Sequence, residues 1–220
     1  MRKLVLTLWL SLTLAIGYSQ NSDYKKNELS IGVLNVNQSP KNQEILFKNS
    51  YYFVPFSNLT YKRFINKNNA IRLTYYRPVI KSNEKPPSNW NDNSNYKEHV
   101  FKIGYEYIFK QKRITPYMAI DITYLKSRAS REGGGGFTGE THKGENNKNG
   151  IGLTPTIGIS YKIYKTIFIG LESNLSIMNI KNEKISTQLY PETNELPTKV
   201  NNTSFEYIFN PIQLIAKFKF

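Results

Sequence analysis

The sequence predicts an all-β protein, an eight-stranded antiparallel up-and-down transmembrane β-barrel. Apolar and polar residues alternate in eight segments, as expected for strands with one lipid-facing and one lumen-facing side. The connections between these segments alternate strictly between short and long. The chain ends on "QLIAKFKF", where phenylalanines alternate with lysines. Phe218 and Phe220 would gain nothing from exposure to water, so we expect their solvent to be lipid.

The first 19 residues are interpreted as a signal peptide. A basic start is followed by the apolar stretch Leu4 to Ile16, and small residues then favour cleavage after Ser19. The apolar stretch is shorter than the roughly 20 residues that a membrane helix needs. We therefore expect a signal peptide over 1–19 and one outer-membrane β-barrel domain over 20–220.

The predicted strands follow one another without a helix, because no later stretch shows sustained helical periodicity. They cover residues 27–36, 51–65, 70–80, 97–110, 114–127, 151–164, 166–179 and 204–220. The short connections are "NKNN", "KQKR" and "YKT", and the long ones cover residues 37–50, 81–96, 128–150 and 181–203. Outer-membrane barrels combine short periplasmic turns with longer outer loops, whereas a soluble sandwich has no reason to do so.

Period-two alternation gives each strand two different faces. In the sixth segment, Leu153, Ile157 and Ile159 alternate with Thr154, Thr156 and Ser160. A soluble sandwich would turn the apolar face toward its core, and a membrane barrel would turn it toward lipid. The signal segment, the loop asymmetry and the terminal phenylalanine favour the barrel.

The composition excludes several kinds of site. The chain has no cysteine, and therefore no disulfide, thiolate metal site or lipidated anchor. The formal net charge is +14, but basic residues such as Lys62, Lys110 and Lys162 gather at the short turns. Nucleic-acid recognition needs a basic patch on an accessible face. We therefore expect no nucleic-acid partner, and interpret the basic residues as a rim that meets anionic lipid headgroups.

The C-terminal "QLIAKFKF" resembles the β-signal read by the barrel-assembly machinery of Gram-negative outer membranes. Gln213, Phe218 and Phe220 match this signal, while Ile215 stands where glycine is usual. The organisation of the mature chain resembles the small outer-membrane β-barrel domain family of Bacteroidetes. The resemblance implies a cell outer membrane location, contact with membrane lipid and lipopolysaccharide, and the barrel-assembly machinery as a partner.

Charged residues on the inward face predict a paired network in the lumen. An eight-stranded barrel is just wide enough for side chains to fill, which argues against a diffusive porin. Buried charges must be paired to be tolerated. Strand parity also turns Lys62 and Lys217 inward. The network that we predict consists of Arg72, Lys102, Glu106, Asp121 and Glu172.

The sequence contains little that indicates a catalytic, cofactor or metal site. A deacylase would need a serine activated by a histidine that an acid orients. His99 has Glu98 beside it, but neighbouring strand residues point to opposite faces, and His142 lies in a glycine-rich loop. That loop satisfies G-x-G-x-x-G from Gly134, without a helix to receive a pyrophosphate. With no metal-ligand spacing either, we predict no catalytic residue, cofactor or metal.

The prediction for function is a non-enzymatic outer-membrane barrel with surface-exposed loops. Its role would be structural, adhesive or accessory to secretion, with a possible extracellular protein or glycan partner. One alternative is an outer-membrane lipid A hydrolase built around His99. Another is a secreted soluble barrel that holds a small ligand, which requires an apolar lumen and a polar exterior.

Overall fold

The computed structural model describes residues 25–38, 51–82, 91–109, 112–134, 141–190 and 197–220. The predicted signal peptide and most of the glycine-rich loop lie outside these residues. Within them, no helix is long and apolar enough to cross a membrane.

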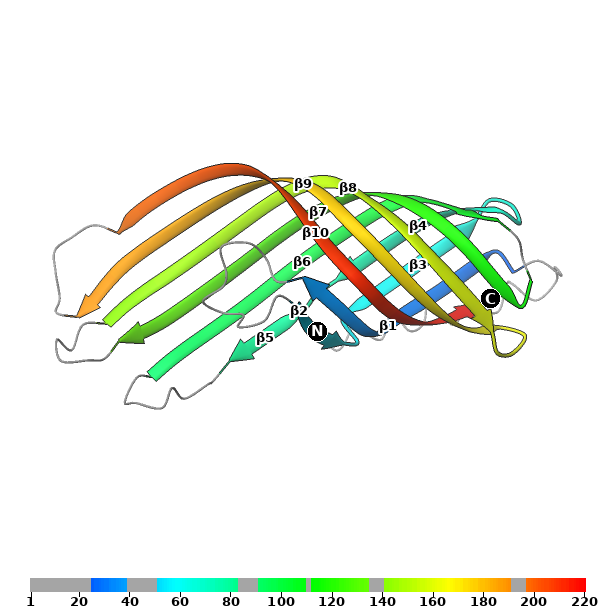
Figure 1. Ribbon diagram of the computed structural model, residues 1–220, viewed down its shortest axis with the longest axis horizontal. Coiled ribbons are helices and arrows are strands. Elements are labelled where there is room, and N and C mark those ends of the chain that lie inside the picture. The colour runs from blue at the N-terminus through cyan, green and yellow to red at the C-terminus, as the bar shows by residue number, and fades with distance from the viewer. Residues whose placement is uncertain (1–24, 39–50, 83–90, 110–111, 135–140, 191–196) are drawn as a thin grey trace, which may run out of the picture.

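One closed antiparallel sheet makes up the described chain (Figure 1). Its strands are β1 (Asn27–Gln38), β2 (Tyr51–Pro55), β3 (Asn58–Phe64), β4 (Asn69–Tyr76), β5 (Val79–Ser82), β6 (Asn91–Ile108), β7 (Ile114–Gly134), β8 (Thr141–Lys162), β9 (Ile167–Tyr190) and β10 (Thr198–Lys219). Pairing between β10 and β1 closes the sheet, with Leu29 opposite Phe218 and Val36 opposite Ile212. The predicted transmembrane-type β-barrel is confirmed.

Ten strands form the eight predicted wall segments, because two segments are interrupted. Both β2 and β3 pair with β1, and the chain bends between them at Phe56, which has a φ of 47°. Likewise β4 and β5 both pair with β6, and Pro78 lies in the gap between them. Proline has no N–H to donate to a sheet, so it suits such an interruption.

The two faces of the wall have opposite polarity, as the alternation predicted. Ile103, Ile120 and Ile122 are about half exposed on the outside, while Asp121 and Thr154 are fully buried inside. The exterior is therefore apolar and the lumen largely polar. This arrangement contradicts the alternative of a secreted soluble barrel, which needs the reverse polarity.

Strands β6 to β10 run further than the sequence predicted. Residues 141–150 and 181–190, which we expected in long loops, belong to β8 and β9. β9 has 24 residues, whereas a membrane-spanning strand needs only about 9–11. We call the added part the outer extension, comprising residues 91–99, 126–134, 141–149, 181–190 and 198–203. In Figure 1 it projects from the end of the barrel opposite to the C-terminus.

The start of the outer extension coincides with a change in the outward-facing residues. Phe101, Tyr124 and Ile151 are cross-strand partners in the last continuous apolar row. The next outward row is polar and contains His99, Lys126, Asn149 and Lys181. The regular alternation that identified the strands ends here, because polar residues predominate on both faces beyond the lipid.

Candidate functional site

Charged side chains and one tyrosine fill the lumen toward the end with the short turns. We call this group the lumen network; it consists of Glu28, Lys62, Arg72, Glu106, Tyr117, Asp121, Glu172, Lys217 and Lys219. Arg72, on β4, is 3% exposed and lies among three carboxylates from three other strands. Its Nη1 is 3.3 Å from Oε2 of Glu106, and its Nε is 3.1 Å from Oδ1 of Asp121. Its Nη2 is 3.6 Å from Oε2 of Glu172.

A second cation extends the network toward β1. Lys62 Nζ lies 2.7 Å from Oε2 of Glu106 and 3.2 Å from Oε1 of Glu28. Lys219 Nζ is 3.7 Å from Oε2 of the same Glu28. Each carboxylate therefore has at least one cation close by, which offsets the cost of burying it.

Tyr117 connects the network to β10. Its hydroxyl donates to Oε1 of Glu172 at 2.7 Å and accepts from Nζ of Lys217 at 2.8 Å. The ring lies over Gly158, where an added Cβ would come within 2.3 Å of the tyrosine Cζ. The glycine thus makes room for the ring that holds Glu172 and Lys217.

The lumen network is balanced in charge. It contains four cations, Lys62, Arg72, Lys217 and Lys219, and four carboxylates, Glu28, Glu106, Asp121 and Glu172. The structure brings Arg72 together with Glu106, Asp121 and Glu172, as the sequence predicted. Lys102 also faces the lumen, but it forms no ion pair within 4.0 Å among the described residues.

Sequence reasoning left Glu28, Tyr117 and Lys219 out of the network. Glu28 could have been predicted from strand parity, because it lies two residues before Ser30 and on the same inward face of β1. Tyr117 gave no signal, since tyrosine occurs on both faces of this barrel. Its role depends on a neighbour, Gly158, that lies on another strand.

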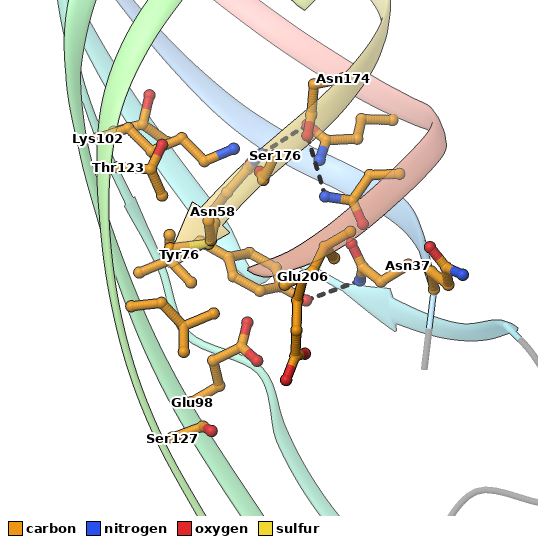
Figure 2. Close-up of a pocket in the computed structure, with 18 of the residues that line it drawn as sticks. Asn37, Asn58, Tyr76, Glu98, Lys102, Thr123, Ser127, Asn174, Ser176 and Glu206 are labelled. Carbon is orange, nitrogen blue, oxygen red and sulfur yellow. Dashed lines mark hydrogen bonds between the residues drawn. The ribbon is translucent and has the colours of Figure 1, made fainter. Parts of the chain in front are cut away.

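A cavity runs through the lumen from the network into the base of the outer extension (Figure 2). It holds about 800 Å³ of empty space, part of it continuous with solvent, and we call it the upper cavity. Arg72 and Glu172 of the lumen network lie at its inner end, together with Lys102. Tyr96 and Glu98 lie at its outer end, and the Tyr96 hydroxyl donates to the Glu98 carboxylate.

An apolar belt surrounds the middle of the upper cavity. Its members are Tyr76, Val100, Leu125, Met178, Ile180 and Ile208, from β4, β6, β7, β9 and β10. These residues occupy inward positions that are otherwise mostly polar. The belt was not predicted, because each strand contributes only one or two of its residues.

His99 has no catalytic surroundings in the structure. Its Nδ1 lies 2.9 Å from the Tyr75 hydroxyl on the outer face of the barrel, while Glu98 points into the lumen. No serine hydroxyl forms a hydrogen bond with His99 among the described residues. The part of the chain that the structure describes also holds no cluster of three or more histidine, aspartate or glutamate residues able to bind a metal.

The three residues of the predicted assembly signal lie on β10 and just after it. Gln213 faces the lumen and accepts a hydrogen bond from Asn58, at 3.5 Å. Phe218 is 43% exposed on the outer face, and its ring stacks with that of Phe220 at a centroid distance of 6.0 Å. The two rings extend the apolar exterior to the end with the short turns.

No protein-family model matches the chain, and no curated protein matches its sequence. Solved structures do match. The outer membrane protein OprG from Pseudomonas aeruginosa aligns with 88% of this chain and 96% of its own, with a TM-score of 0.50 and 10% identity. A major outer membrane protein from Thermus thermophilus aligns with 88% of this chain and 99% of its own, with a TM-score of 0.50 and 7% identity. The chain has the fold of small outer-membrane β-barrels.

A further match is Ail, the attachment invasion locus protein of Yersinia pestis, with a TM-score of 0.47 and 12% identity over 89% of this chain and 99% of that chain. At such low identities the matches establish the fold alone. The apolar exterior is the independent reason to locate the barrel in an outer membrane, since it would be unfavourable in water.

Proposed function

We propose that the chain is a non-enzymatic outer-membrane barrel, closed to diffusion, that presents its outer extension at the cell surface. The observation that carries this proposal is the lumen network, which fills the inner part of the barrel with paired charges and a tyrosine. A structural or adhesive role fits such a barrel better than the passage of solutes. Asn, Lys and Ile usage supports a source among the Bacteroidetes.

The position of the first polar row supports lipopolysaccharide as a partner. Lys126 and Lys181 face outward on either side of Asn149, immediately beyond the last continuous apolar row. Neighbouring strands lie about 4.8 Å apart, so the two lysines emerge roughly 10 Å from each other. Anionic groups of the lipid headgroup lie at this level, where lysines are favourable. A protein or glycan partner would meet the extension further out.

The lipid A hydrolase is the weaker candidate. It requires a serine, a histidine and an acid on one face. His99 instead contacts Tyr75, and Glu98 lies on the other side of the wall.

Electrical recording tests the closed lumen. We expect the mature chain, refolded in detergent and inserted into a planar lipid bilayer, to give no steady ionic conductance above that of the bare membrane. The folded state would be verified by the mobility of the unboiled protein on a gel. Stable conductance steps from a preparation so verified would contradict the proposal and support a channel.

The absence of cysteine permits a direct test of orientation in cells. Ser186→Cys lies in the outer extension, and Lys165→Cys lies in the exposed turn between β8 and β9. We expect a membrane-impermeant maleimide to label the Ser186 variant on intact cells and the Lys165 variant only after permeabilisation. The opposite labelling pattern would show that the extension faces the periplasm.

A further inference from the structure

Among the described residues, Lys102 is the inward-facing cation of the upper cavity that forms no ion pair within 4.0 Å. The eight charges of the lumen network balance one another, and Lys148, on the far wall, pairs with Glu206 at 2.9 Å. Among the described residues, Lys102 has no carboxylate within 4.0 Å and no hydrogen bond. Figure 2 shows its side chain reaching into the upper cavity from β6.

A lysine is costly in a confined lumen unless something compensates its charge. The carboxylates that act on Lys102 from a distance are Glu98 and two network members, Asp121 and Glu172, which are paired with Arg72. Its register partners are Thr123 on β7 and Thr74 on β4. Both are neutral hydroxyl residues that line the same cavity. The inner end of the upper cavity therefore combines one cation that has no close carboxylate with several hydrogen-bonding groups.

The apolar belt lies next to Lys102 on the outward side. Val100 lies two residues before Lys102 on the same face of β6, and Leu125 is the register partner of Val100. Met178, which is 1% exposed, contributes to the same belt from β9. Small-molecule sites in proteins are concave, and they combine apolar walls with a few polar groups that set the orientation of the ligand. The upper cavity has the apolar belt at its middle and polar groups at either end.

The outer end of the cavity disfavours an anion. Glu98 lies four residues before Lys102 on the same inward face, which corresponds to about 13 Å along an extended strand. Ser127 is the register partner of Glu98 and is 4% exposed. The Ser127 hydroxyl has no hydrogen-bond partner among the described residues. An acidic ligand would thus orient its charge toward Lys102 and a polar group toward Glu98 and Ser127.

We propose that the upper cavity binds a small organic acid, with its carboxylate on Lys102 and its apolar body within the belt. Charge and shape both recognise such a ligand: Lys102 has no close carboxylate among the described residues, and the belt provides the apolar contact. The lumen network closes the cavity on its inner side, so the site retains the ligand without conducting it. This site is separate from the surface role proposed above, and either can fail without the other.

The methionines of the mature chain allow a direct binding measurement. Only Met118 and Met178 remain after the predicted cleavage; Met178 lines the cavity, and Met118 is 47% exposed on the outer face. With methyl-labelled methionine, NMR spectra of the refolded chain would be recorded during titration with 4-phenylbutyrate. We expect a saturable shift of the Met178 signal and none of the Met118 signal, which reports partition into the micelle.

Two comparisons identify the role of the charge. Hydrogen bonds to charged groups contribute about 1.5–3 kcal/mol, so Lys102→Gln should weaken binding roughly tenfold or more. Lys97→Gln removes the same charge from an exposed position of the same strand and should leave the affinity unchanged. The neutral analogue 4-phenylbutanol should bind the unmodified chain as weakly as the acid binds the Lys102 variant. Equal shifts at both methionines, or equal affinity in the Lys102 and Lys97 variants, would overturn the proposal.

Discussion

Replacing Arg72 by methionine should lower the free energy of unfolding by about 3–5 kcal/mol, the range measured when one partner of a buried ion pair is removed. The reason is the carboxylates that the change leaves behind. Asp121 is fully buried, and Arg72 is the only cation within 4.0 Å of it among the described residues. Glu172 would keep only Lys217, at 4.0 Å, and the Tyr117 hydroxyl. Glu106 would keep Lys62.

A second substitution tests whether the orphaned charge causes the loss. Asp121→Asn removes the negative charge while keeping the shape of the side chain, so Arg72→Met combined with Asp121→Asn should recover much of the stability. Unfolding would be followed by the gel mobility of unboiled samples across a urea series in detergent. Arg63→Met is the matched control, because Arg63 is exposed and adjacent to Lys62. It loses one exposed hydrogen bond, to Asn27 at 2.8 Å, and should change stability by no more than about 1 kcal/mol. A double variant no more stable than Arg72→Met would exclude Asp121 as the source.

The wall of the barrel was predictable because lipid imposes one simple rule. A strand that crosses hydrocarbon must present apolar residues on every second position, and that rule identified all eight wall segments. The same rule places Arg72, Glu106, Asp121 and Glu172 in one lumen. It cannot give their distances, which depend on register and on glycines such as Gly158 that leave space for a side chain on another strand.

The rule of apolar residues on every second position no longer applies outside the hydrocarbon layer. Before Ile151, β8 is polar on both faces, so residues 141–149 looked like a loop in the sequence although they pair with β7 and β9. The break at Phe56 was missed for a different reason. A positive φ at a phenylalanine reflects constraints from neighbouring strands rather than a local preference.

The upper cavity depends on the assembly of the whole barrel. Val100, Leu125 and Ile180 each look like an isolated departure from alternation on an otherwise polar face. They form a belt only because the register places β6, β7 and β9 with these residues in contact. Lys102 was predicted as a network member since its parity is inward, and only the structure separates it from the carboxylates.

Removing the two terminal rings should abolish most outer-membrane assembly in cells. If residues Gln213 to Phe220 form the signal that the barrel-assembly machinery reads, then Phe218→Ala combined with Phe220→Ala removes its aromatic positions. Neither ring contributes to the lumen network, because Lys217 and Lys219 occupy the inward positions of this segment. We therefore expect the double variant to refold in detergent but to yield little folded, heat-modifiable protein in outer-membrane fractions.

The effect of removing lipid-facing rings on stability must be separated from the loss of recognition by the barrel-assembly machinery. Each ring transferred from lipid to water costs about 1.5–3 kcal/mol, so any pair of lipid-facing phenylalanines affects stability. Phe101→Ala combined with Phe109→Ala removes two exposed rings, one on β6 and one directly after it, at a distance from the terminus. If recognition is the cause, both double variants lose similar stability in urea, but only the terminal one fails to assemble in cells. Equal assembly of the two would assign Phe218 and Phe220 to the apolar exterior alone.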